Sequence, residues 1–422
     1  MVREYCRVSE REGDDFVGLR YVGQQPVVVF PRGFSISDNE KTLRRDVLRL
    51  LATIGKFSGH REGERVRNLA GETTLSFPYL SYQYVIYDYL AHGYYTESEV
   101  KYSDQQRGKI SWKRTIQQKT PQIDEDNVVY LSFVVKQNQT NHNSLLTRIH
   151  EFCVYQSFSR LGWLYTDSEI LPPKPSIRLN KRLFISTLKQ ALSSTFNEQK
   201  RLLFQSMINI IAESDEQADD RRSYAFGVER FDHVWEGLVD YVFGDADKER
   251  YYPRANWHIV QGHGGVFPSS ELRPDTVVKV IDKVFILDAK YYKYGVTLNP
   301  MHLPATDSIQ KQITYGEYVE REGLAQRNKI FNAFIMPFNS RTGEPFKFVT
   351  VGTAEWKEYG PETANYEYIL GLLVDTTYLL RTYSRHNLAE IDRLTTLIEE
   401  SLESYRIRCG QSHEQIQGGG VT

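Results

Sequence analysis

The hydrophobic and polar positions at the start of the chain predict two strands followed by a helix. The runs Phe16–Val22 and Pro26–Phe30 are rich in β-branched and aliphatic residues and have the length of strands. Ser37, with Glu40 three residues later, predicts a capping box that starts a helix. The helix then carries one apolar stripe, formed by Leu43, Val47, Leu50, Leu51 and Ile54.

The middle of the chain predicts helices around one strand and one polar loop. Phe77–Leu90 alternates tyrosines with aliphatic residues, which suits a helix or a strand, and we favour a helix. Asn127–Val135 is predicted to be a strand, and the Asn-, Gln- and Thr-rich segment 136–143 a loop. Leu145–Gly162 is predicted to be one helix, and Lys181–Ile211 a long helix or a pair of helices.

In the second half of the chain, predicted strands and helices alternate. Phe231–Phe243 has an amphipathic helical pattern that ends at Gly244, and Trp257–Val260 is predicted to be a strand. The later elements are a hairpin over 275–290, a helix from 304, strands over 330–338, 346–351 and 368–374, and a helix over 388–402. The order helix, strand, hairpin, helix, strand predicts an αβββαβ core in an α/β (α+β) protein.

The candidate chemistry lies at the open end of the hairpin. Asp275 precedes its first strand, and Asp288, Ala289 and Lys290 end its second. Strand alternation places Asp288 and Lys290 on one face, and the hairpin brings Asp275 beside them. Two carboxylates are costly at the end of a hydrophobic sheet unless a cation neutralises them, and Mg²⁺ prefers carboxylate oxygens. Spacing alone fits a magnesium site and a surface hairpin with a solvated salt bridge equally well.

This arrangement, Pro274-Asp275 followed by Asp288-Ala289-Lys290, resembles the motif of the PD-(D/E)xK nucleases. Its context favours a metal site over a surface hairpin. The Asp-Ala-Lys triplet directly follows an apolar strand, and an amphipathic helix containing Gln and Tyr comes after it.

Composition and charge limit the partners of the chain. The 422 residues are 40% hydrophobic and 25% charged, as in globular proteins, and the formal charge is −2. A protein that holds DNA alone usually has a basic surplus, so its basic surface must be local or a partner must supply it. The sequence contains no P-loop and no GxGxxG motif, which predicts no nucleotide site of its own.

Cysteine usage and hydropathy indicate the compartment. The three isolated cysteines argue against zinc and a disulfide scaffold and suit a reducing cytosol. No apolar run approaches the roughly 20 residues of a membrane span, and the first residues lack the apolar core of a signal peptide. We therefore expect a cytoplasmic protein without membrane contact.

Two breaks in the sequence predict three domains. A proline-rich segment at 172–175 is a rigid break, and the acidic run 213–220 has the composition of a solvated linker. We predict an N-terminal mixed β/α domain over 1–170, a helical connector with the acidic linker over 171–220, and a domain built on the αβββαβ core over 221–422.

A basic and aromatic stretch in the N-terminal domain allows two interpretations. Between Val100 and Ile116, basic and aromatic residues alternate across a glycine-containing turn. The stretch is either an ordinary surface hairpin with a solvated basic face or a loop that contacts phosphate or a partner, and spacing does not separate them. Its basic residues are Arg107, Lys109, Lys113 and Arg114.

Taken together, these segments resemble the LlaJI family of restriction endonuclease subunits, which are similar to McrC, the nuclease subunit of the McrBC systems. The resemblance covers nearly the whole chain and rests on segments 34–41, 107–115, 231–242, 273–295 and 307–315. It implies a PD-(D/E)xK restriction-endonuclease-like core and Mg²⁺-dependent cleavage of double-stranded DNA, with Mn²⁺ able to substitute. It also implies a McrB-like AAA+ GTPase partner, which residues 1–170 would engage, and a second nuclease copy for double-strand cleavage.

The resemblance also implies roles for individual residues. Asp275 and Asp288 would hold Mg²⁺, with the backbone carbonyl of Ala289 as a further candidate ligand. Lys290 would orient the attacking water or neutralise charge in the transition state. Glu236 matches a glutamate that this class often places on the preceding helix, where it ligates the metal directly or through water; the alternative is a solvent-side helix residue.

Residues after the triplet are candidates for DNA contact or support. Gln312 and Tyr315 lie near the position of a Q-x-x-x-Y motif in RecB-like relatives, although the spacing here is Q-x-x-Y. Gln310 competes with Gln312 for that role, and Lys293 is a candidate contact to the DNA backbone. The histidines do not cluster in the sequence, and we expect each to be structural: His142, His150, His233, His258 and His263.

Two other functions remain open on the sequence. A standalone RecB-like repair or recombination nuclease would need its own basic DNA channel and would cut without a partner. A non-catalytic regulatory subunit would stimulate a GTPase ring, but its decayed nuclease site would be expected to lack at least one charge of the Asp275, Asp288 and Lys290 set.

Overall fold

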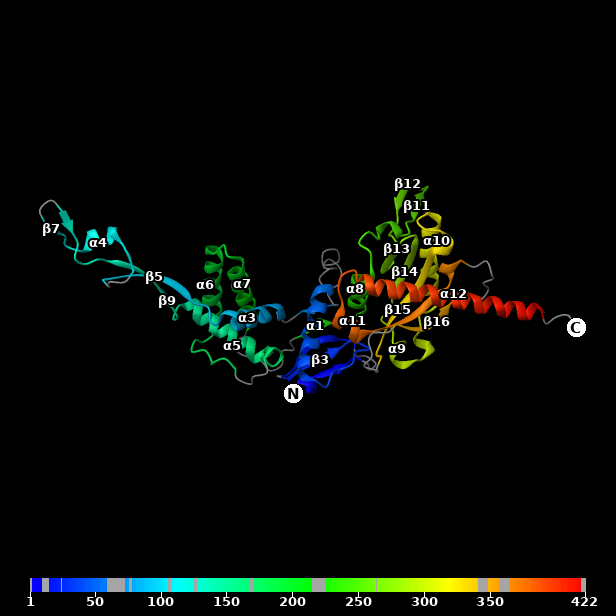
Figure 1. The fold of residues 1–422 in the computed structure, drawn as a ribbon, viewed down its shortest axis with the longest axis horizontal. Helices are drawn as coiled ribbons and strands as arrows, with labels where there is room; N and C mark the ends of the chain where they lie inside the picture. The colour runs from blue at the N-terminus through cyan, green and yellow to red at the C-terminus, as the bar shows by residue number, and fades with distance from the viewer. Residues whose placement is uncertain are drawn as a thin grey trace. The chain divides into compact units, whose positions relative to one another are not determined.

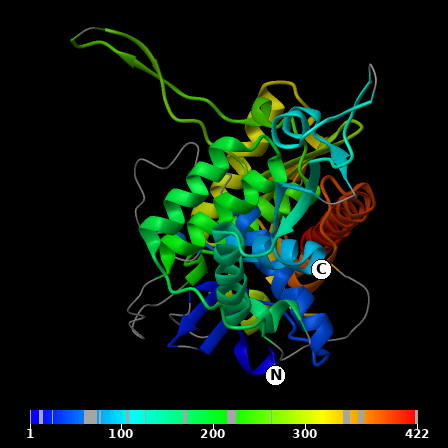
Figure 2. The ribbon, with the colours of Figure 1, turned by 90° about the vertical axis from the view of Figure 1, so that its left-hand side faces the viewer.

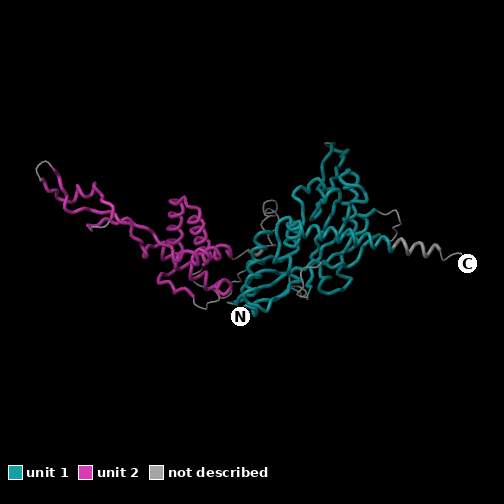
Figure 3. Tube along the Cα trace, in the orientation of Figure 1, with its two compact units in different colours: residues 1–76, 221–422 teal, residues 77–220 magenta. Residues whose placement is uncertain are grey.

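A computed structural model provides the coordinates of the chain. The structure describes residues 2–9, 15–23, 25–58, 73–75, 78–104, 108–124, 127–166, 171–214, 225–262, 264–340, 348–356 and 364–418. Contacts divide the chain into two compact units, which Figure 3 colours separately. Unit 1 comprises residues 1–76 and 221–422, and unit 2 comprises residues 77–220.

The division differs from the predicted domains because a sheet joins the two ends of unit 1. Its five strands have the order β1-β3-β2-β10-β4, and only β1 and β3 are parallel. These strands are β1 (Cys6–Val8), β2 (Val17–Val22), β3 (Gln25–Phe30), β4 (Thr73–Leu75) and β10 (Ala225–Val228). Since β10 pairs with both β2 and β4, the first 76 residues group with the C-terminal half and not with residues 77–170. The two predicted N-terminal strands, Phe16–Val22 and Pro26–Phe30, are confirmed.

Helix α1 (Glu40–Ser58) packs on this sheet and on the second half of unit 1. Its predicted apolar stripe is fully buried, which confirms the helical pattern. The predicted capping box is wrong, because the helix begins three residues later than Ser37. Asn39 is the N-cap instead, and its side-chain oxygen accepts the backbone N–H of Thr42 at 3.0 Å. Asp46, buried on α1, accepts two hydrogen bonds from the guanidinium of Arg381.

A second five-stranded sheet forms the main core of unit 1, and its strand order is β13-β14-β15-β17-β16. Its strands are β13 (Thr276–Val280), β14 (Lys283–Ala289), β15 (Ile330–Phe338), β16 (Val349–Ala354) and β17 (Ile369–Asp375). The predicted hairpin is confirmed, since β13 and β14 are antiparallel. Strands β14, β15 and β17 are parallel neighbours, and β16 is an antiparallel edge strand (Figure 1). The central strands are buried almost throughout, as is usual for parallel neighbours.

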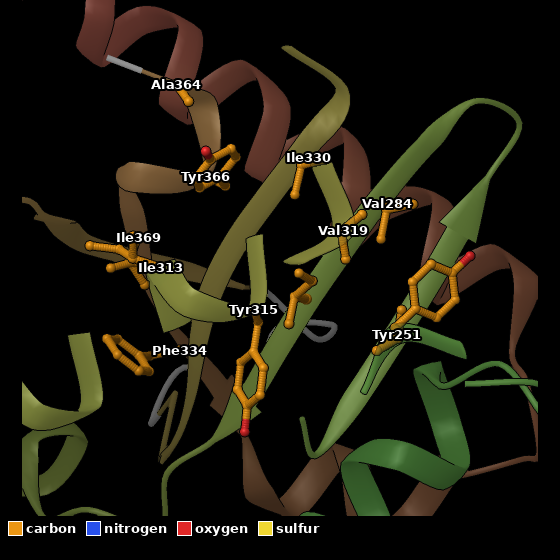
Figure 4. Packing of buried hydrophobic residues seen from close by; sticks show 12 residues of the cluster. Tyr251, Val284, Ile313, Tyr315, Val319, Ile330, Phe334, Ala364, Tyr366 and Ile369 are labelled. Atoms are coloured by element: carbon orange, nitrogen blue, oxygen red, sulfur yellow. The ribbon is translucent and has the colours of Figure 1, made fainter. Parts of the chain in front are cut away.

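Helix α10 (Thr306–Arg321) covers one face of this sheet. Its Ile313, Tyr315 and Val319 pack against the alternate residues of the strands, including Val284 and Phe334 (Figure 4). The other helices of unit 1 are α8 (Asp232–Phe243), α9 (Tyr294–Thr297), α11 (Thr376–Thr382) and α12 (Leu388–Gly418). Helices α8 and α12 also contact the strands, and the predicted helices at 231–243 and 388–402 are confirmed.

The first strand of the predicted αβββαβ core, Trp257–Val260, does not join the core sheet. It exists as β11 (Asn256–Ile259), and among the described residues it pairs only with β12 (Gly265–Pro268), in a separate two-stranded sheet. Aromatic and β-branched residues favour the extended conformation here, yet all eight residues of the two strands are exposed. The propensity was therefore sufficient to predict a strand but not its partner.

Unit 2 combines a helical layer with small antiparallel sheets. The helices are α3 (Tyr79–His92), α4 (Trp112–Gln118), α5 (Leu145–Tyr165), α6 (Lys181–Ser194) and α7 (Glu198–Glu213). The strands are β5 (Glu97–Ser103), β6 (Lys109–Ile110), β7 (Gln122–Asp124), β8 (Asn127–Val129) and β9 (Val135–Asn141). Helices α3 and α5 confirm the prediction, and Lys181–Ile211 is a helix pair.

Three predictions in unit 2 are corrected. The polar segment 136–143, predicted to be a loop, mostly forms strand β9, because it pairs with β5 along seven residues. The predicted strand Asn127–Val135 is divided, and 130–134 belongs to neither β8 nor β9. The basic stretch is not a simple hairpin, since Lys113 and Arg114 lie on helix α4.

Some sequence predictions lie outside the described residues, namely those for Arg107, His263 and most of the acidic run 213–220. Among the residues that the structure describes, no helix is long and apolar enough to cross a membrane.

Candidate active site

The hairpin register brings Asp275 and Asp288 together. Thr276 lies opposite Leu287, so the next positions outward on the two strands are Asp275 and Asp288. Both belong to the face that α10 covers, because they alternate with Val277 on one strand and with Ile286 on the other. The backbone N–H of Ala289 donates to Asp275 Oδ2 at 3.0 Å, which fixes this carboxylate. Asp288 is only 2% exposed.

Lys290 neutralises one of these two carboxylates. Its Nζ lies 2.7 Å from Asp288 Oδ2, and its backbone N–H donates to the carbonyl of Ile335 on β15 at 2.9 Å. Burial by itself lowers the pKa of Lys290, but the charge of Asp288, the hydrogen bond to it and the charge of Asp275 outweigh burial and raise that pKa. The ammonium is therefore held in its charged form beside Asp288.

The site still has more negative than positive charge. Burial raises the pKa of Asp275 well above its usual range, and the charges of Asp288 and Glu236 and a hydrogen bond with Asp288 raise it further. The single hydrogen bond from Ala289 opposes this shift without cancelling it. Such a cluster suits a divalent cation. Burial and mutual repulsion disfavour the charged carboxylates, and the positive charge of a cation stabilises them.

Helix α8 supplies a second group of ligand-type side chains next to Asp275. Glu236 is half-buried, and its Oε2 lies 3.6 Å from Nδ1 of His233. Asp232, His233 and Glu236 each offer one ligand atom, and these atoms lie within 4.8 Å of one another. Glu236 therefore belongs to both clusters and is not a solvent-side residue. His233, expected to be structural, lies at the site; its i, i+3 spacing from Glu236 on a helix was the available signal.

Tyr315 and Gln312 both lie buried on α10, but in different roles. Gln312 donates from Nε2 to the carbonyl of Ile286 at 2.8 Å, which ties the helix to β14 and gives no route to DNA. The Tyr315 hydroxyl has no hydrogen-bond partner in the described part of the chain. Burial, followed by the charges of Asp288 and Asp275, raises the pKa of Tyr315, so this hydroxyl stays protonated close to the carboxylates.

A cavity of about 770 Å³ opens beside Asp275 and Glu236. Lys248, which the sequence analysis did not select, lines it and donates from Nζ to the Asp275 backbone carbonyl at 2.8 Å. The same Nζ lies 2.7 Å from Asp240. The cavity is also lined by the basic residues Lys56, Arg250 and Arg385. Acidic residues line it too, namely Glu236, Asp240, Asp245, Asp247 and Asp275, so basic side chains alternate with carboxylates on the way to Asp275.

The remaining predicted residues are not part of this cluster. Gln310 is exposed on α10, and Lys293 is half-buried immediately before α9. In unit 2, Lys109, Lys113 and Arg114 are exposed, and the Arg114 guanidinium lies 3.7 Å from the centre of the Tyr102 ring.

The chain matches the family model described as LlaJI restriction endonuclease over residues 16–356, and it therefore belongs to that family. It is 25% identical over 344 residues to the type II restriction enzyme BsuMI component YdjA of Bacillus subtilis, covering 78% of this chain and 73% of that protein. A chain from an assembly of Thermococcus gammatolerans McrB AAA+ hexamers with bound McrC is 16% identical, with a TM-score of 0.40. That match covers 91% of this chain and 83% of the other.

Proposed function

We propose that this member of the restriction endonuclease family is a Mg²⁺-dependent endonuclease subunit that hydrolyses phosphodiester bonds of double-stranded DNA. The observation that supports the proposal is the pair of neighbouring carboxylates of Asp275 and the buried Asp288, with one ammonium, Lys290, 2.7 Å from Asp288. Two neighbouring carboxylates in a largely buried place destabilise the folded protein, and a bound cation would offset that cost. We place this activity in the cytoplasm.

Asp275, Asp288 and Glu236 are the side chains that would hold the cation, with the Ala289 carbonyl as a further candidate. When bound, Mg²⁺ supplies Lewis-acid polarisation of the scissile phosphate and a more acidic water. Mn²⁺, with similar oxygen preference, would serve in its place.

The protein residues around the cation would orient the reaction. Lys290, held charged by Asp288, is placed to orient the attacking water or to stabilise charge on the phosphate oxygens in the transition state. Lys248 and Arg250 line the cavity through which a phosphate would approach Asp275. Tyr315 keeps a protonated hydroxyl available near the carboxylates.

We further propose that a McrB-like AAA+ GTPase recognises and translocates the DNA. Two features of the sequence support a separate motor: it has no P-loop, and its formal charge of −2 gives no general attraction to DNA. The Bacillus subtilis relative is itself named as one component of a restriction enzyme. Within the predicted partner-binding region, 1–170, the exposed Lys109, Lys113 and Arg114 are candidate contacts.

A single Asp275, Asp288 and Lys290 site cuts one strand at a time. Cleavage of both strands would therefore use a second copy of the chain.

Plasmid cleavage in Mg²⁺ tests this function. Wild type and Asp288→Ala would each be assayed alone and with the GTPase of the same restriction system plus GTP. We expect cleavage only with the partner and GTP, complete loss in Asp288→Ala, and unchanged stimulation of GTP hydrolysis by that variant.

Other outcomes would contradict parts of the proposal. Efficient cutting by the lone chain would identify a standalone nuclease. Stimulated GTP hydrolysis without any cutting by wild type would identify a regulatory subunit, and cutting by Asp288→Ala would exclude the proposed metal site.

A further inference from the structure

The two-stranded sheet β11–β12 forms an arm on unit 1. Backbone hydrogen bonds close its base, from Ser269 to the Ala255 carbonyl at 2.7 Å and from Leu272 to the Pro253 carbonyl at 3.0 Å. Figure 2 shows the arm, in yellow-green at the upper left, extending beyond the helices and sheets of unit 1. The chain runs from Leu272 at its base into Asp275 of the proposed active site, so the arm is joined to that site by two residues, Arg273 and Pro274.

The arm exposes apolar side chains that a folded protein ordinarily buries. Trp257 is 69% exposed and Phe267 is 47% exposed, and the two lie directly opposite each other in the register. Opposite residues point to the same face, so an indole and a phenyl ring form one aromatic surface. Val260, near the tip, is 96% exposed. Apolar exposure of this kind marks a surface that meets a partner.

The arm has no acidic side chain that would repel a polyanionic partner. From Ala255 to Ser270 the sequence contains no Asp or Glu, and no Lys or Arg. The chain has 54 acidic residues among 422, so a stretch of this length would contain about two on average. At the base, Arg254 and Arg273 both lie beside Glu271, at 2.9 and 3.7 Å, so two basic side chains accompany one acidic side chain there. A second copy of this chain, with formal charge −2, offers no comparable complementarity.

We propose that the arm enters a groove of the substrate DNA beside the cleaved phosphate, with Trp257 and Phe267 against the bases; this rests on the proposed nuclease function. A two-stranded β-ribbon fits the major groove, which is about 8.5 Å deep. The five residue-to-residue steps from Leu272 to Phe267 span up to about 17 Å when extended, which is enough to reach the groove floor. Aromatic side chains contribute to binding by stacking on bases or wedging between them.

The test is DNA binding by the complex of this chain with its GTPase, in Ca²⁺ to prevent cleavage, measured by anisotropy of a labelled duplex. The arm variant Trp257→Ser/Phe267→Ser is compared with Phe196→Ser, a matched control in unit 2 whose aromatic ring is 94% exposed. We expect about tenfold or greater weakening for the arm variant and none for the control. Mn²⁺ binding by the arm variant should equal that of wild type, which shows that the nuclease site is folded.

Three results would overturn the proposal. Equal DNA affinity of the arm variant and wild type would exclude a groove contact. Conversion of a wild-type dimer to a monomer by the arm substitutions, measured by sedimentation without DNA, would assign the arm to a second copy. Failure of the wild-type complex to bind DNA at all would overturn the proposed function together with the arm, whereas the first two results leave the proposed function standing.

Discussion

The end of the β13–β14 hairpin buries charged side chains, whereas the β11–β12 arm exposes apolar ones. At the hairpin, Asp288 is buried and Asp275 has a raised pKa among further acidic groups. On the arm, Trp257 and Val260 are exposed to solvent. The two regions are adjacent in sequence and share the connection through Pro274.

Neither departure stabilises the free protein, and for this reason we propose that both are places where a ligand binds. Burying like charges disfavours the folded state, and exposing aromatic rings forgoes burial worth about 25 cal/mol for each Å². The hairpin end has more carboxylates than ammonium groups, and the arm lacks a covering surface. We propose that a metal ion supplies the missing charge and that a DNA groove covers the arm.

The largest effect is expected for Asp275→Asn, which changes the hairpin and not the arm. We expect cleavage to fall by at least about a hundredfold, because a neutral amide cannot replace a charged metal ligand. Without metal, the melting temperature at pH 8 should rise, since the substitution removes a carboxylate charge that burial, Asp288 and Glu236 all disfavour. Nuclease assays and thermal melts measure the two effects. A lower melting temperature with normal cleavage would mean that Asp275 is structural.

Lys290→Ala separates catalysis from metal binding within the hairpin. We expect cleavage to fall about a hundredfold, while Mn²⁺ binding is retained because Asp288 loses a competing cation. Lys279→Ala, an exposed lysine of the same hairpin, is the control and should cut like wild type. Loss of Mn²⁺ binding in Lys290→Ala would show that the lysine holds the site together and has no separate catalytic role.

The stability and the metal affinity of the hairpin should both depend on pH. Asp275 has a raised pKa in the folded state, so its contribution to the stability of the metal-free protein is present at low pH and is lost as pH rises through that pKa. Metal ligands must be deprotonated, so Mg²⁺ affinity should increase with pH, by up to about tenfold for each pH unit below the raised pKa. Calorimetry at several pH values measures this. An affinity independent of pH in that range would contradict a protonated Asp275.

The smallest effect is expected for Gln312→Ala, which tests whether α10 supports the hairpin or contacts DNA. The substitution removes the hydrogen bond to Ile286 and should cost about 1–3 kcal/mol of unfolding free energy. DNA affinity and cleavage should be unchanged at temperatures well below the melting point. Weakened DNA binding with normal stability would restore the role predicted from the sequence.

The sequence predicted what depends on local pattern and missed what depends on distant neighbours. The Asp275, Asp288 and Lys290 cluster could be predicted, because strand alternation and a tight hairpin fix it within 16 residues. The placement of β11 could not, since an apolar strand carries no information about which sheet it joins. The insertion of β10 between β2 and β4 joins residues 150 positions or more apart in sequence, beyond the reach of any periodicity.

The same distinction applies to single residues. Lys248 was missed because it reaches the Asp275 carbonyl from a turn that has no motif. His233 was dismissed because it has no histidine neighbour in the sequence, although a helix places it beside Glu236. Gln312 carried a motif-like spacing, but its face of α10 turns toward β14.

The central claim is that Asp275 and Asp288 form a divalent-cation site, and titration with Mn²⁺ followed by electron paramagnetic resonance tests it most directly. Wild type, Asp288→Asn and Lys279→Ala would be titrated at pH 8. We predict saturable binding by wild type and Lys279→Ala and its loss in Asp288→Asn. Binding by Asp288→Asn with the affinity of wild type would contradict it.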